Sequence, residues 1–128
     1  MKSFTSDQPA AVLVPRNYLH ACLLLLIAEE PAHGYELGER LAGLGLTGTD
    51  SGAVYRALRA LNQDGLLESW WEESGPGPVR RRYRLSDAGA ASLEAWAGTV
   101  GSSASYLNSF LTRHRRLHDT PFAASGAR

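Results

Sequence analysis

The chain has 128 residues, of which 44% are apolar and 20% charged, and this composition fits one compact globular domain. Thirteen basic and thirteen acidic residues cancel, so the net charge alone gives no argument for nucleic acid. Cys22 is the single cysteine, which excludes an intrachain disulfide, and the apolar run at 21–28 is shorter than the roughly 20 residues that span a bilayer. Because the first residues do not form a signal peptide, we expect a cytoplasmic protein with no membrane partner.

The charges are unevenly distributed along the chain. Residues 17–50 carry five acidic side chains and one Arg, whereas residues 51–84 carry six Arg and four acidic side chains. Positive charge therefore gathers in the second half of the domain. Residues 1–15 and 119–128 show no hydrophobic periodicity, and we expect them to form a flexible arm and a flexible tail.

Two short helices are predicted in the first part of the chain. Residues 17–29 are apolar on nearly every side, as in a helix that is covered by several neighbours, and Pro31 ends it. Residues 34–42 place apolar side chains near one side of a second helix, which Gly45 ends.

A third helix is predicted to follow Asp50 or Ser51, either of which can cap it. Its apolar residues recur at i, i+4 and i+7, which indicates a narrow buried stripe, and Gly65 ends the helix. The other faces carry polar side chains that suit contacts with DNA: Tyr55, Arg56, Arg59, Asn62 and Gln63.

From Leu66 the hydrophobic period changes to two, which predicts a β-hairpin of residues 66–73 and 79–85 around the turn SGPGP. One side of the second strand holds Val79, Arg81, Tyr83 and Leu85. The other side is strongly cationic and holds Arg80, Arg82 and Arg84. Two interpretations of this side are open: its arginines bind phosphates, or they form a solvated face balanced by Glu68, Glu72 and Glu73.

The last predicted helix covers residues 86–118 and begins with Ser86 and Asp87, which cap it and complement its dipole. Gly101 lowers the local helix propensity, so a break there is the alternative to one continuous helix. A small chain has little surface to cover the heptad seam of this helix, so we predict a homodimer. The seam consists of Leu93, Ala97, Val100, Ala104, Leu107 and Leu111.

The order helix, helix, turn, helix, hairpin predicts a mostly α (α+β) fold: a winged helix-turn-helix domain at 16–85 with a two-stranded wing, followed by a dimerisation helix at 86–118. In such a domain the third helix enters the major groove of double-stranded DNA. The sequence therefore predicts a DNA-binding transcriptional regulator. The competing interpretation is a module that binds hydrophobic ligands or a protein, with weak DNA binding.

Three segments resemble the PadR-type transcriptional regulators: LLLLIAEEPAHGYEL at 23–37, SGAVYRALRALNQDGLLES at 51–69 and GPVRRRYRLSDAGAASLEAW at 77–96. The short C-terminal part is similar to that of the smaller PadR subtype, and the first segment is similar to the branch of polyhydroxybutyrate-responsive repressors. The resemblance implies a dimer that binds an imperfect palindrome and represses a neighbouring gene until an effector arrives.

The resemblance also implies roles for particular residues. Ser51, Gly52, Tyr55 and Arg56 match the start of the family's recognition helix, and Arg80 and Arg81 match its basic wing residues. Two positions differ from the family pattern. Ala53 stands where many members have Thr, and Arg82 stands where an aromatic is frequent, so we expect a wing that is more phosphate-directed.

Trp96 matches an aromatic that, in some small PadR-type proteins, faces the dimer centre and stacks on flat hydrophobic ligands. With Tyr18, Ala97 and Val100 it would form a site for a hydrophobic or aromatic effector. The alternative is that Trp96 only packs in the dimer interface. We predict that this interface consists of Leu19, Leu23, Leu93, Trp96, Val100, Leu107, Phe110 and Leu111.

No nucleophile with a base, phosphate loop or metal cluster stands at a recognisable spacing, so we predict no catalytic residue, no cofactor and no metal. His114 and His118 are four residues apart and could grip a metal, but no third ligand accompanies them, and a solvated helix end is the favoured interpretation. His20 and His33 have no nearby Cys or carboxylate pattern that would make a metal site, and packing or helix-end roles suffice for them.

Overall fold

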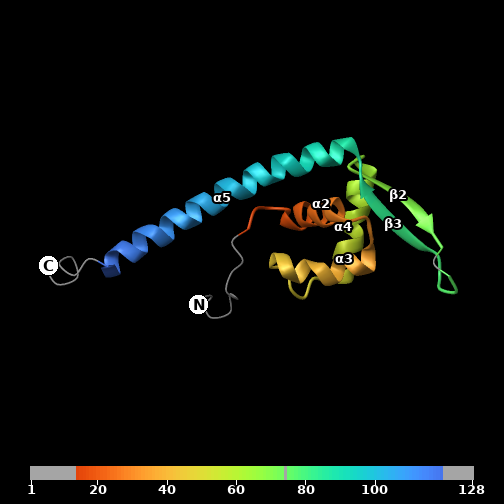
Figure 1. Ribbon diagram of the computed structural model, residues 1–128, viewed down its shortest axis with the longest axis horizontal. Helices are drawn as coiled ribbons and strands as arrows, with labels where there is room; N and C mark the ends of the chain where they lie inside the picture. The colour runs from red at the N-terminus through yellow and green to blue at the C-terminus, as the bar shows by residue number, and fades with distance from the viewer. Residues whose placement is uncertain (1–13, 74, 120–128) are drawn as a thin grey trace, which may run out of the picture.

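The computed structural model describes residues 14–73 and 75–119, so most of the predicted arm and tail lies outside the described residues. Figure 1 shows the short helices packed into one body beside a hairpin, with one long helix leading away from it. This arrangement is the predicted winged helix-turn-helix with a long C-terminal helix. Its elements are α2 (Tyr18–Glu29), β1 (Ala32–His33), α3 (Gly34–Arg40), the 3-10 helix η1 (Leu41–Leu44), α4 (Ser51–Gln63), β2 (Leu67–Glu72), β3 (Arg80–Leu85) and α5 (Asp87–Asp119).

The hydrophobic core is built around α2, which is covered on most of its circumference. Leu23 and Leu24, which are adjacent residues of α2, both have no exposed surface, as the apolar run predicts. By contrast α4 buries only one stripe, formed by Val54, Ala57, Leu58 and Leu61. The prediction that Leu23 lies in a dimer interface is wrong, because a side chain that is fully buried in its own subunit has no surface to offer a partner.

The sheet has three antiparallel strands in the order β1-β3-β2. The hairpin of β2 and β3 follows the prediction, but β1 was not predicted, because a strand of two residues is too short to show a hydrophobic period. Ala32 pairs with Tyr83, and His33 pairs with Arg82. Through these pairs β1 attaches the hairpin to the residue that precedes α3.

The predicted caps confine α4 to its observed length. The carboxylate of Asp50 accepts a hydrogen bond from the backbone N–H of Ala53 at 3.2 Å. At the other end Gly65 adopts a φ of 80°, which only glycine adopts at no steric cost. The start of α4 is therefore held at a defined position after the turn, and this position matters for the candidate site.

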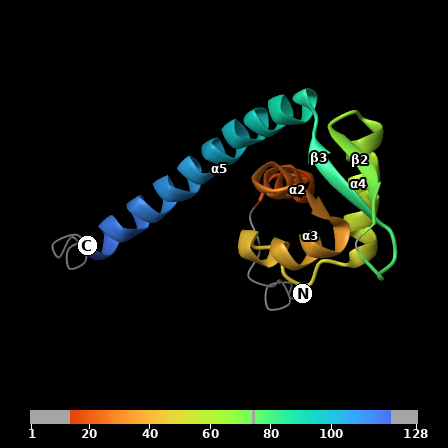
Figure 2. The same ribbon diagram turned by 45° about the vertical axis from the view of Figure 1, so that its right-hand side comes forward.

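The last helix, α5, is continuous over 33 residues, so the chain does not break at Gly101. The Ser86 hydroxyl begins it by accepting from the Gly89 N–H at 3.0 Å and donating to the Gly65 carbonyl oxygen at 2.6 Å. Its first turns pack on α2 and β3, and its second half leaves the body (Figure 2). Residues 104–119 are all exposed. Within the described ranges, no helix has the length and apolar character to cross a membrane.

Gly89 lets the start of α5 approach the backbone of Leu66. A Cβ at this position would overlap the Leu66 carbonyl oxygen, which accepts a hydrogen bond from the Ser86 N–H at 3.1 Å. We expect Gly89→Ala to lower the free energy of unfolding by about 1–3 kcal/mol, measured by urea denaturation at one protein concentration.

Gly98→Ala is the matched control in the same helix, because no neighbouring atom of the described residues lies within 4 Å of a Cβ added there. It should raise the free energy of unfolding by up to about 1 kcal/mol, since alanine favours the helix. Equal stabilities of the two variants would contradict the close approach at Gly89.

Candidate nucleic-acid interface

The candidate DNA-binding surface lies between α4 and the face of the hairpin that is turned toward it. Two hollows open there, of about 680 and 330 Å³, and Tyr55, Arg81 and Tyr83 line both of them. The larger hollow is also lined by His33, Gly34, Tyr35, Trp71 and Arg80, and the smaller by Arg59, Asn62 and Gln63. No Asp or Glu side chain of the described residues lines either hollow, so hydrogen-bond donors and aromatic rings dominate this surface.

The strand register decides which wing arginine faces α4. Tyr83 is 7% exposed and packs into the core, so Arg81, two residues away, lies on the same side of β3. The Nε and Nη2 atoms of Arg81 donate to the Ser69 hydroxyl at 3.0 and 2.8 Å, and its guanidinium lies 5.2 Å from the centre of the Trp71 ring. Arg81 is therefore held in place beside α4.

On the opposite side of the hairpin, carboxylates of the wing pair with Arg82 and Arg84, whereas Arg80, at the first position of β3, lines the larger hollow. Arg82 donates to Glu72 at 2.9 Å and to the Pro31 carbonyl oxygen at 3.0 Å. Arg84 donates to Glu68 at 2.9 Å and lies 5.4 Å from the centre of the Trp70 ring. These contacts favour a balanced face for Arg82 and Arg84, the second of the two interpretations, and a phosphate contact of Arg82 stays a prediction.

The arginines beside α4 are not neutralised in this way. In the part of the chain that the structure describes, Arg59, Arg80 and Arg81 form no ion pair with a carboxylate. Arg56 lies 3.8 Å from Asp50, but the two side chains are 68% and 72% exposed, and such surface pairs contribute only about 0–1 kcal/mol. The surface around α4 therefore keeps a net positive charge, which is available to an anionic partner.

The Tyr83 hydroxyl on this surface remains a hydrogen-bond donor. Burial raises the pKa of Tyr83, and the guanidinium groups of Arg81 and Arg59 only partly oppose this rise. The phenol therefore stays protonated at neutral pH. Tyr55 is 45% exposed on α4, one turn after Ser51 and Gly52, so the predicted start of the recognition helix is accessible.

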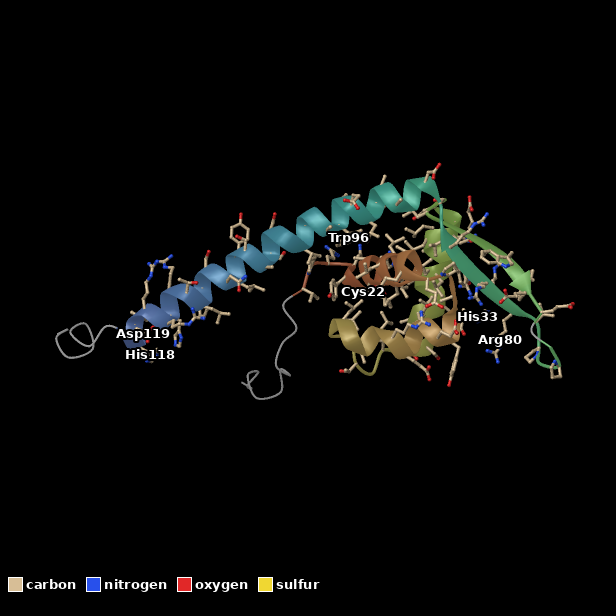
Figure 3. All side chains as sticks on the ribbon, in the orientation of Figure 1. Cys22, His33, Arg80, Trp96, His118 and Asp119 are labelled. Carbon is tan, nitrogen blue, oxygen red and sulfur yellow. The ribbon has the colours of Figure 1, made fainter. Side chains whose placement is uncertain are left out.

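His33 connects the helical body to the hairpin: it takes the predicted helix-end role at the start of α3, and it also lies beside a carboxylate of the hairpin. Its side chain is 11% exposed, and Nε2 lies 3.1 Å from a Glu72 oxygen and 3.3 Å from Nη1 of Arg82. Its backbone N–H donates to Glu36 at 3.0 Å, which lowers the pKa of that carboxyl. Figure 3 shows His33 where the helices meet the hairpin.

A local signal existed for only part of this cluster. Glu36 follows His33 by three residues, the spacing of a capping box, and the structure forms that box. Glu72 is 39 residues away, so only the folded chain brings it to His33. Tyr35, 64% exposed beside the larger hollow, was also missed, although an exposed aromatic on a short helix is a signal for a binding surface.

The four residues predicted to bind an effector come together at a second site. Tyr18, Trp96, Ala97 and Val100 line an apolar pocket of about 380 Å³ between α2 and α5. Figure 3 shows Trp96 on α5 close to Cys22 on α2. Burial raises the pKa of both Tyr18 and Cys22, so the pocket walls are uncharged at neutral pH. The remaining wall consists of Ala21, Cys22, Leu25, Leu44, Leu93 and Gly101.

The other predicted residues lie on α5 or beside it. Leu19, Leu93 and Trp96 are partly buried against the core, whereas Leu107, Phe110 and Leu111 are exposed on the second half of α5. At its end the Nε2 atoms of His114 and His118 lie 3.2 Å apart, within hydrogen-bond distance. No group of three or more possible metal ligands occurs within residues 14–73 and 75–119.

Comparisons with known proteins agree with this geometry. The model of the family described as "Transcriptional regulator PadR-like family" matches residues 23–95. A PadR-like transcriptional regulator from Bacillus cereus is 31% identical with a TM-score of 0.65, over 73% of this chain and 90% of that one. A PadR family regulator from Eggerthella lenta is 29% identical with a TM-score of 0.63, and the match covers 75% of this chain and 83% of that one.

A third structure is Bacillus subtilis PadR in complex with operator DNA. It is 22% identical with a TM-score of 0.57, over 62% of this chain and 47% of that one, so the likeness shows the fold alone. Among curated proteins, no match was found.

Gly34 leaves room for the ring of Tyr55 at the candidate surface. A Cβ on Gly34 would lie 2.5 Å from Cε1 and 3.0 Å from Cζ of that ring. We expect Gly34→Ala to displace the ring and to weaken DNA binding about tenfold, the loss that one misplaced contact of about 1–3 kcal/mol produces. Fluorescence anisotropy with labelled DNA from upstream of the gene measures this change.

Gly38→Ala is the control, because in the part of the chain that the structure describes no neighbouring atom lies within 4 Å of a Cβ added at this position of the same helix. Both variants should unfold at similar temperatures. Unchanged DNA affinity of Gly34→Ala would show that the position of the Tyr55 ring is unimportant for binding.

Proposed function

Because this chain belongs to the PadR-like family of transcriptional regulators, we propose that it is a cytoplasmic repressor that binds a palindromic operator as a homodimer. The observation that carries this proposal is the positive charge left beside α4. Arg59, Arg80 and Arg81 form no ion pair with a carboxylate of the described residues, although the same hairpin neutralises Arg82 and Arg84. A protein that only bound hydrophobic ligands would need no such surface.

The exposed start of α4 is the part that fits the major groove. Tyr55 and Arg56 lie close to the helix N-terminus, where side chains reach base edges in helix-turn-helix proteins. The backbone N–H groups around Ser51 and Gly52 favour a phosphate, since they lie at the positive end of the helix dipole. Arg80 and Arg81 would then bind the backbone of the flanking DNA.

The exposed half of α5 supports the homodimer. Leu107, Phe110 and Leu111 are 42%, 69% and 51% exposed, on the half of α5 that leads away from the described helical body (Figure 1). Apolar side chains gathered on one exposed helix are typical of an interaction surface. A two-fold dimer would place two recognition helices about 34 Å apart, one turn of DNA, and so would require a palindromic operator.

The apolar pocket supports release by a small effector. Its volume of about 380 Å³ is that of a small-molecule site, and Trp96 offers an aromatic face to a planar molecule. The same pocket is compatible with the second candidate function, a hydrophobic-ligand-binding module with weak DNA binding. The DNA experiment below distinguishes the two.

Arg81 should contribute to binding through phosphate contacts. We expect Arg81→Gln to lower the affinity for DNA from upstream of the gene about tenfold, and to lower the slope of log affinity against log salt by about 0.9. Gel-shift titrations at several KCl concentrations, with scrambled DNA as competitor, measure both quantities.

Arg84→Gln is the matched control on the same strand, because Arg84 faces away from α4 and pairs with Glu68. Its affinity and salt slope should equal those of the unaltered protein. Equal and weak binding of the unaltered protein to both DNAs would instead favour the ligand-binding module.

A substitution at Leu107 tests the proposed homodimer. We expect Leu107→Glu to place a charge in the interface and to shift the protein from dimer to monomer, measured by sedimentation velocity at micromolar concentration. Ser105→Glu adds the same charge two residues earlier, on another side of the exposed helix, and should stay dimeric. A dimer that persists in Leu107→Glu would place the interface elsewhere.

A further inference from the structure

A side-chain hydrogen bond connects the apolar pocket to the helix-turn-helix. The Tyr18 ring is part of the pocket wall, and its hydroxyl donates to the Leu44 carbonyl oxygen at 3.1 Å. These two residues are 26 positions apart, so this bond joins the start of α2 to the end of η1. Leu44 also lines the pocket with its side chain, so a molecule in the pocket would contact both partners of the bond.

We propose that Tyr18 couples the pocket to the DNA-binding surface: a planar apolar molecule that enters the pocket displaces the Tyr18 ring, breaks its bond to Leu44 and weakens DNA binding. This inference rests on the proposed function, and it specifies how the effector site of the regulator is coupled to its DNA site. Tyr18 is a positioning residue here, since it does not lie at the DNA surface.

The turn after Leu44 can transmit such a displacement to α4. The N–H groups of Gly45 and Leu46 donate to the carbonyl oxygens of Ala42 and Leu41, both at 3.1 Å. The Thr49 hydroxyl then donates to the Leu46 carbonyl oxygen at 3.2 Å. Asp50, the next residue, caps α4. The segment from η1 to the cap is therefore tied by successive hydrogen bonds, so that a shift at its first end moves the start of the recognition helix.

The hydrogen bond between Tyr18 and Leu44 is either formed or broken, and a molecule in the pocket favours the broken state. Trp96 and Tyr18 both line the pocket, so a ring that stacks on Trp96 lies within reach of the Tyr18 ring and competes with Leu44 for its position. Tyr18 is half-buried at the first position of α2, whereas Trp96 lies in the third turn of α5, a helix that packs on α2. The Cys22 thiol lies beside the Tyr18 hydroxyl, but sulfur is a weak acceptor and does not replace the carbonyl. Occupancy of the pocket thus opposes the bond, and by linkage DNA binding opposes occupancy of the pocket.

The test compares the unaltered full chain with Tyr18→Phe, which removes the hydroxyl and keeps the ring. Tyr106→Phe is the control, because it removes the hydroxyl of a tyrosine that is 77% exposed on α5. The probe is N-phenyl-1-naphthylamine, a neutral planar molecule whose fluorescence reports its own binding. Gel-shift titrations with the upstream DNA give the DNA affinity of each protein without the probe and at a saturating probe concentration, and thermal unfolding checks that all three proteins are folded.

In the unaltered protein and in Tyr106→Phe, we expect the probe to lower DNA affinity about fivefold, the effect of losing one hydrogen bond. Tyr18→Phe should bind the probe with similar affinity. Its DNA affinity without the probe should already be about fivefold lower, and the probe should change it less than about twofold, because the bond that the probe would break is absent.

Three results would overturn the coupling: an equal probe effect in Tyr18→Phe and the unaltered protein, a probe that binds without changing DNA affinity, and a probe that does not bind. In each of these cases specific binding of the unaltered protein to its upstream DNA would leave the proposed function standing. Loss of that specific binding in the absence of the probe would overturn the proposed function, and the coupling with it.

Discussion

The function of this protein depends on the register of β3, the central strand of the sheet. A slip of one residue would exchange the two faces of the strand, because the side chains of a strand alternate. Tyr83 would then leave the core, and Arg81 would point away from α4. Two sets of contacts hold the observed register: Tyr83 is buried, and β3 is paired on both of its edges. The position of the positive charge therefore follows from the burial of one aromatic side chain.

The same strand separates structural arginines from available ones. On one face Arg82 is bound by Glu72, His33 and the Pro31 carbonyl, so its charge fixes the hairpin to the helical body. On the other face, the hydrogen-bond partner of Arg81 among the described residues is a neutral hydroxyl and its guanidinium lies against an aromatic ring, so its charge remains available. A guanidinium that is already paired would have to exchange a carboxylate for a phosphate, and this exchange gains little. Position on the strand thus decides the role of each arginine.

Helix α2 links the two proposed activities. One part of its surface forms the core under α4 and the sheet, and another part forms the pocket under α5. The helix is apolar around its circumference because both of these surfaces need apolar side chains. An effector in the pocket and DNA at α4 are consequently separated by one packed helix and one turn. A regulator of this size can therefore be controlled without a separate ligand-binding domain.

The sequence alone determined the helices, their caps and the hairpin, because each of them depends on residues that are close together in the chain. The stripe of α4, the caps at Asp50 and Ser86 and the alternation along β3 are short-range patterns, and the structure confirms them. The sequence did not show that β1 pairs with β3, that His33 meets Glu72, or that Leu23 is buried so completely that it has no surface for a partner. Nor did it show which side of the wing faces α4, or that Tyr18 reaches Leu44. Each of these features joins residues far apart in the chain, so it exists only once the tertiary structure has brought them together.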